Sequence, residues 1–135
     1  MLSVALISVV AVSLYAAIAG GFATVQVARE NLRATQVLTE KMETIRLYTW
    51  DQINSNGFVP ATFTVPFSPT TNDQGAVTGL LYTGLVTVAN TGLTESYSTN
   101  LKLVTVTLNW TSGNVSRTRT MTTLVSRYGL QNYVY

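Results

Sequence analysis

The chain has 135 residues, enough for one small domain plus an extension, and its eight Lys and Arg against six Asp and Glu give a net charge of +2. It contains no Cys and no His, which excludes disulfides, thiol catalysis, the usual zinc sites and histidine acid–base chemistry. So small a net charge gives no argument of its own for a nucleic-acid partner.

The first 28 residues carry no charged side chain, and Arg29 is the first charge in the chain. This run is longer than the roughly 20 apolar residues that span a bilayer as a helix. It is apolar on every side, so lipid or other protein must surround it. A cleaved secretory signal fits less well, because no Lys or Arg precedes the run and the run is long for a signal core. A plain membrane anchor and an anchor that later becomes a packing surface both stay open.

Residues 29–53 follow without Gly or Pro, and their apolar side chains recur at helical spacing at Leu38, Met42 and Ile45. The charged residues of this stretch mostly lie on other faces, as in an amphipathic helix. Nothing separates this helix from the apolar run. We therefore predict one continuous helix of about 50 residues, about 75 Å long, with an apolar first half and an amphipathic second half.

Residues 54–135 change from helical spacing to alternation and are rich in Thr, Ser, Asn and Val. The alternation predicts strands at 80–89, 103–110 and 118–128. Residues 62–67 also alternate, and Pro66 and Pro69 mark them as an edge strand or a loop. Exposed loops are predicted at 68–78 and 90–100, and a hairpin turn at 111–114. The tail after Gly129 contains two tyrosines.

These elements predict an α+β fold in which the long N-terminal helix packs on an antiparallel sheet of three or four strands. A sheet this small needs cover on one face, and the amphipathic half of the helix is the obvious cover. The predicted core between helix and sheet consists of Leu38, Met42, Ile45, Val104, Val106, Leu108 and Trp110, with Trp50 as a further candidate.

A helix that begins at the first residue, runs apolar and then amphipathic, and leads into a small antiparallel sheet resembles the type IV pilins and the pseudopilins of type II secretion. The most specific part of the resemblance is Met1 to Ala28 followed by Arg29-Glu30-Asn31-Leu32-Arg33. Family members carry a glutamate at the fifth mature position, where this chain has Ala5. Two explanations stay open: Met1 is the mature start and the acid is missing, or an upstream segment that contains the leader and the glutamate is absent from the sequence.

The resemblance implies a structural protein, the major subunit of an extracellular type IV pilus-like filament, and not an enzyme. Such a subunit waits in the inner membrane, meets the assembly machinery there, and then polymerises with copies of itself. It needs no cofactor, metal or small-molecule substrate. The implied filament-core residues are Leu2, Val4, Leu6, Ile7, Val9, Val10, Val12, Leu14, Tyr15, Ile18, Phe22 and Val25. Small residues in the same run allow close helix approach, and the pair Gly20-Gly21 is the point where the helix can bend or melt.

Charged residues beside the apolar run are candidates for setting the register between subunits: Arg29, Glu30 and Arg33. An ordinary solvated helix face is the alternative interpretation. By parity, Arg117, Arg119 and Arg127 share one strand face, which leaves a small basic stripe for nucleic acid or an acidic polysaccharide as an option.

Two alternative functions stay open. One is a minor pilin or pseudopilin of a type II secretion-like system, which differs from a major subunit mainly in abundance. The other is a monomeric, membrane-anchored β domain that binds an extracellular or cell-wall ligand. Acidic residues outside the helix lie in separate turn-like contexts, and no pattern of a nucleophile and a base indicates catalysis.

Overall fold

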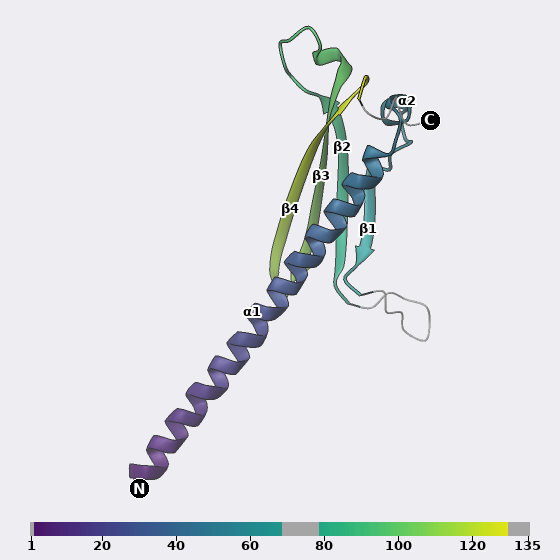
Figure 1. The fold of residues 1–135 in the computed structure, drawn as a ribbon. Helices are drawn as coiled ribbons and strands as arrows, with labels where there is room; N and C mark the ends of the chain where they lie inside the picture. The colour runs from purple at the N-terminus through teal and green to yellow at the C-terminus, as the bar shows by residue number, and fades with distance from the viewer. Residues whose placement is uncertain (1, 69–78, 130–135) are drawn as a thin grey trace, which may run out of the picture. The chain divides into compact units, whose positions relative to one another are not determined.

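The computed structural model describes residues 2–68 and 79–129, and the chain forms two compact units that divide between Leu32 and Arg33. The first unit is the apolar part of helix α1 (Figure 1). The second unit contains the rest of α1, the short helix α2 and the sheet. The amphipathic part of the helix from Arg33 onward thus forms one unit with the β domain.

Helix α1 spans Leu2–Arg46, and its 45 residues correspond to about 68 Å. The long helix was predicted to reach residue 53 and ends seven residues earlier. After Arg46 the chain makes a tight turn in which Tyr48 N–H donates to Ile45 O (3.1 Å). Thr49 then caps α2, Trp50–Asn54, through a capping box: its Oγ1 accepts from Gln52 N–H and its N–H donates to Gln52 Oε1.

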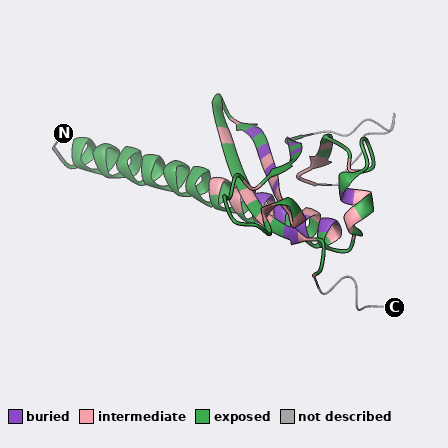
Figure 2. Cartoon of the chain, turned by 90° about the horizontal axis from the view of Figure 1, so that it is seen from above, coloured by how far each residue is buried: buried purple, intermediate pink, exposed green. Residues whose placement is uncertain are grey.

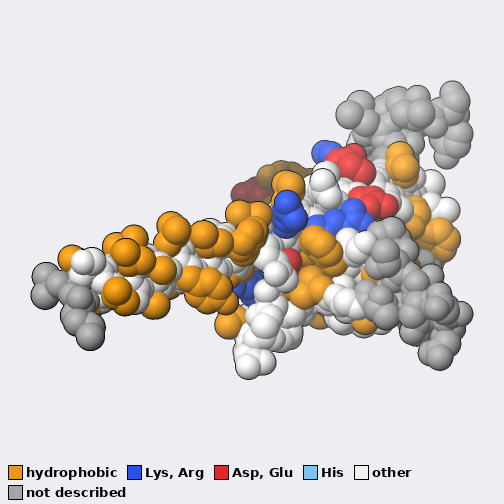
Figure 3. Space-filling model, turned by 90° about the horizontal axis from the view of Figure 1, so that it is seen from below, with side chains coloured by type: hydrophobic (Ala, Val, Ile, Leu, Met, Phe, Trp, Pro, Cys, Tyr) orange, Lys and Arg blue, Asp and Glu red, His pale blue; other side chains and the backbone are white. Residues whose placement is uncertain are grey.

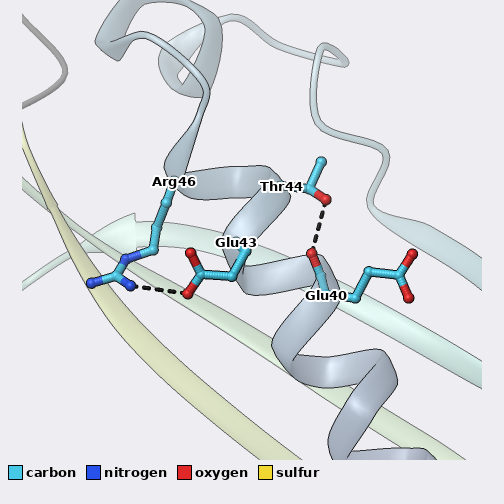
Figure 4. A network of polar contacts seen from close by, with 4 residues as sticks. All are labelled: Glu40, Glu43, Thr44 and Arg46. Carbon is cyan, nitrogen blue, oxygen red and sulfur yellow. Dashed lines mark hydrogen bonds and ion pairs between the residues drawn. The ribbon is translucent and has the colours of Figure 1, made fainter. Parts of the chain in front are cut away.

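The last turns of α1 are stabilised by local contacts (Figure 4). Arg46 Nη1 lies 3.0 Å from Glu43 Oε1, and Thr44 Oγ1 donates to Glu40 O at 2.8 Å. A basic side chain in the last helical turn also complements the partial negative charge of the helix C-terminus. Both partners of the ion pair are more than half exposed, so the pair adds little to stability.

The four strands form one antiparallel sheet in sequence order, with β1 at one edge and β4 at the other (Figure 1). Their bounds are β1 Thr62–Pro66, β2 Leu81–Asn90, β3 Leu101–Ser112 and β4 Val115–Ser126. Gly113 and Asn114 close the β3–β4 hairpin between the pair Ser112 and Val115. Gly113 has φ +58°, the positive value that the first position of a type II′ turn requires.

The described elements therefore confirm the predicted α+β architecture, with β3 and β4 longer than expected. Of the predicted loops, 90–100 ends in a short 3₁₀ helix, Ser98–Asn100. Most of the predicted loop 68–78 lies outside the described residues, as do the tail tyrosines.

The core lies between one face of the sheet and the segment of α1 that belongs to the second unit (Figure 2). All seven residues expected to join helix and sheet are buried. Six further side chains complete the core: Ala34, Val37, Ile53, Tyr82, Val86 and Val125. Trp50 is only half-buried at the start of α2, and Ile53, one turn later, is the side chain that reaches the core.

The opposite face of the sheet is covered by none of the described elements. Along a strand, successive side chains point to opposite faces, and residues paired across strands share a face. The uncovered face therefore carries Thr107, in the middle of β3, its partners on the neighbouring strands, and every second residue from these along each strand. We call this the threonine face. Its members are Thr62, Thr64, Pro66, Leu81, Thr83, Leu85, Thr87, Ala89, Leu101, Leu103, Thr105, Thr107, Asn109, Thr111, Ser116, Thr118, Thr120, Thr122, Leu124 and Ser126.

Candidate assembly surface

The apolar segment of α1 is exposed throughout (Figure 2), and hydrophobic side chains line the face of it seen in Figure 3. Between Val4 and Val25, eleven large hydrophobic side chains are 49 to 76% exposed. They are the predicted filament-core residues Val4, Leu6, Ile7, Val9, Val10, Val12, Leu14, Tyr15, Ile18, Phe22 and Val25. The side chain of the twelfth, Leu2, lies outside the described part of the chain. Among the described residues, α1 is the one helix long and apolar enough to cross a membrane.

Three of the hydroxyl side chains in this segment bond to their own helix. Ser8 Oγ donates to Ala5 O (2.8 Å), Ser13 Oγ to Val9 O (2.8 Å) and Thr24 Oγ1 to Gly20 O (3.0 Å). A hydroxyl bonded to a carbonyl one turn earlier needs no partner from the surroundings. The segment therefore presents an apolar surface that suits lipid or a packed helix bundle equally well.

Gly20 and Gly21 both lie within the regular helix. Apart from its chain neighbours and the adjoining backbone of its own helix, a Cβ built on either glycine would meet no described atom within 4 Å. Nothing in the described chain therefore requires glycine at these two positions, although each costs about 1 kcal/mol relative to Ala in a helix. A close approach by a second helix is one physical reason for such residues.

The three residues proposed to set the register between subunits differ in their surroundings. Arg29 is exposed, and Arg33 is half-buried. Glu30 is buried, and its Oε1 accepts a hydrogen bond from Gln26 Nε2 at 3.2 Å. Arg29 is thus the member of the set most open to a neighbouring subunit.

A shallow groove of about 320 Å³ runs between α1 and the edge strand β1. Arg33, Glu40 and Lys41 line its helix side, and Phe63 and Val65 line its strand side. Lys41 Nζ lies 4.8 Å from the centre of the Phe63 ring, a cation–π contact. The groove mixes both charge signs and has no cluster of catalytic groups. No group of acidic residues among those described could hold a metal ion.

The basic stripe expected on the last strand is arranged differently in the structure. Arg117 and Arg119 do share a face of β4, but it is the face that the helix covers: Arg117 pairs with Trp110 and Arg119 with Leu108. Arg119 Nη1 also donates to Thr35 Oγ1 on α1. Arg127 lies beyond the end of β4. The alternation of side chains along β4 correctly placed Arg117 and Arg119 on one face. Which face of the sheet this is depends on the strand register.

Sequence reasoning missed one packing contact that fixes the groove. Phe63 lies opposite Gly84, where a Cβ would come within 2.1 Å of Phe63 Cζ. The ring therefore occupies the space that any larger residue at position 84 would need. An aromatic residue paired across strands with a glycine was the available signal, but recognising it requires the β1–β2 register.

Three comparisons with known proteins bear on this surface. No protein-family model, no curated protein and no solved structure matches the chain.

Proposed function

We propose that the protein is the major structural subunit of an extracellular type IV pilus-like filament, assembled by packing of its N-terminal helices. The observation that carries the proposal is the set of eleven large apolar side chains exposed around α1. Full burial of such a side chain is worth about 1.5–3 kcal/mol, so leaving all eleven in water would cost on the order of 20 kcal/mol. Whole domains are stable by only about 5–15 kcal/mol. The segment must therefore stay in an apolar environment.

Two environments meet this need in succession. In the membrane, lipid surrounds the apolar segment of the waiting subunit. In the filament, the same segments of other copies replace the lipid and form the core. A contact between identical chains that does not close on itself extends into an open helical filament. The local hydrogen bonds of Ser8, Ser13 and Thr24 allow the segment to move between these environments without unpaired hydroxyls.

The continuity of α1 supports a role in assembly beyond simple anchoring. The helix runs without a break from the apolar segment into the amphipathic part that packs on the sheet. A Gly- or Pro-rich linker, which would let a binding domain move freely above a membrane, is absent between Leu2 and Arg46. The second candidate function is a monomeric membrane-anchored binding domain. The single observation in its favour is that the apolar helix is long enough to cross a membrane.

The two candidates are separated by replacing both glycines with leucine, Gly20→Leu with Gly21→Leu. These changes make the helix more apolar and more helical, so membrane insertion is preserved or improved. The Cβ atom of either new side chain meets no atom within 4 Å apart from the neighbouring backbone of its own helix. A simple anchor would tolerate them, whereas closely packed helices would not. We expect normal amounts of the variant in the membrane fraction and little or none in filaments sheared from the cells.

The matched control is Val10→Leu, which adds bulk at an apolar position that already carries a large side chain. We expect this variant to assemble in amounts close to those of the unmodified chain. If the double glycine variant formed filaments as abundantly as the control, close packing around residues 20 and 21 would be refuted. If neither chain left the membrane fraction, the anchored binding domain would become the better account.

A further inference from the structure

The threonine face carries no charged residue in any of the four strands. The charged residues of the strands, Lys102, Arg117 and Arg119, all lie on the opposite, helix-covered face. Protein surfaces that stay in water usually carry interspersed charged residues, which discourage association. A face that lacks them entirely has lost this protection, so a neutral partner can cover it without burying a charge.

The side chains of the face also suit a packed contact. Thr is β-branched, and its short side chain has little rotamer freedom to lose. Some hydroxyls already bond along the face: Thr107 Oγ1 lies 3.2 Å from Thr120 Oγ1, and Thr118 Oγ1 donates to Asn109 Oδ1 at 2.7 Å. Each hydroxyl oxygen retains a further lone pair for a partner. Leu85 and Leu124 are about half exposed and add apolar contact area.

The size of the face is close to what a stable contact needs. Four strands about 4.8 Å apart give a width of about 19 Å, and strands of about ten residues give a length of about 33 Å. The face thus covers about 600 Å² on one copy, and two such faces together bury about 1,200 Å². That value is the lower end of the range for specific interfaces between proteins.

We propose that the threonine face is a self-association surface, against which the threonine face of a second copy packs sheet on sheet. Charge and area both allow this partner: an uncharged face meets its own copy without like-charge repulsion, and two such faces reach the area of a specific contact. A twofold contact brings the same patch from both copies together. The contact is separate from helix packing, so it can form even if the chain makes no filament. The contact closes on itself as a pair, so it joins two chains and does not extend the filament.

The absence of Cys from the chain makes a direct test possible, since one introduced cysteine reports only on its own surroundings. Thr105→Cys, Thr107→Cys and Thr120→Cys place a thiol near the centre of the face. Thr39→Cys and Ser55→Cys are the controls, because both positions are exposed and lie on other elements. The full-length chain is oxidised in detergent, and covalent dimer is measured on a non-reducing gel. We expect at least one central variant to form dimer at five or more times the control level.

A second measurement does not depend on cysteine geometry. Thr107→Lys places like charges opposite each other across the contact. We expect it to weaken dimerisation in sedimentation experiments at least tenfold, with an unchanged circular dichroism spectrum. Carried out with Gly20→Leu and Gly21→Leu present, both assays should give the same result, which separates this contact from helix packing. The proposal is overturned if central and control cysteines crosslink equally. It is also overturned if the chain stays monomeric and Thr107→Lys instead abolishes binding to a neutral cell-wall polysaccharide.

Discussion

Replacing Gly84 with alanine tests the packing of the edge strand on the sheet. The new Cβ would lie 2.1, 2.2 and 2.6 Å from three atoms of the Phe63 ring. Carbon atoms in contact are normally about 3.5–4.0 Å apart, so the ring must move by more than about 1 Å. Phe63 packs against the core and lies beneath Lys41, which restricts such a movement. We expect Gly84→Ala to lower the free energy of unfolding by about 1–3 kcal/mol.

The assay is urea unfolding of the full-length chain in detergent, followed by tryptophan fluorescence, in a Trp50→Phe background so that the signal comes from Trp110, which is buried in the core. In a domain of this size, each kcal/mol corresponds to a fall of about 4–8 °C in the melting temperature. The decisive control is the same substitution in a Phe63→Ala background. There the clash is gone, and Ala in place of Gly within a strand should stabilise the protein by about 0.5–1 kcal/mol.

The expected change of sign between the two backgrounds is a coupling between residues 63 and 84. An equal loss of stability in both backgrounds would show that Gly84 is required for a reason other than the Phe63 ring, and the reasoning would be wrong.

Three further substitutions have expected outcomes in the same unfolding assay. Leu38→Ala removes a side chain that is 2% exposed in the core and should cost about 2–5 kcal/mol; a loss below about 1 kcal/mol would contradict the described helix–sheet packing. Thr49→Ala removes the cap of α2 and should cost about 1 kcal/mol, whereas Thr49→Ser should retain most of the stability. Arg46→Ala breaks an exposed ion pair and should change stability by less than about 0.5 kcal/mol at any salt concentration; a large, salt-sensitive loss would show that the pair contributes more than its exposure suggests.

Much of the fold could be predicted because the periodicity of the chain is strong. In β3, Val104 to Trp110 alternate so regularly that both the strand and its buried face follow from the sequence. The apolar segment of α1 is evident from composition alone, and with it the candidate assembly surface. The end of α1 was missed because neither Gly nor Pro stands between Arg46 and residue 53. The available signal was the pair Thr49 and Gln52, whose spacing is that of a capping box.

Other features depend on which strands are neighbours, and local sequence contains no such information. Tyr82 and Val125 are buried because they lie on the same face as Val104 and Val106, which only the register reveals. The uncharged threonine face is likewise invisible until all four strands are aligned. The placement of Arg117 and Arg119 on the helix-covered face follows from the same alignment. Parity within one strand predicts which side chains share a face, and the sheet decides which face is covered.

The most direct test of the central claim is electron microscopy of material sheared from cells that express the unmodified chain, with mass spectrometry to identify the subunit. The account predicts thin filaments built mainly of this protein, with the apolar segment of α1 inside and protected from added protease. Cells that hold the protein only in the membrane fraction, with no filaments in the sheared material, would contradict it.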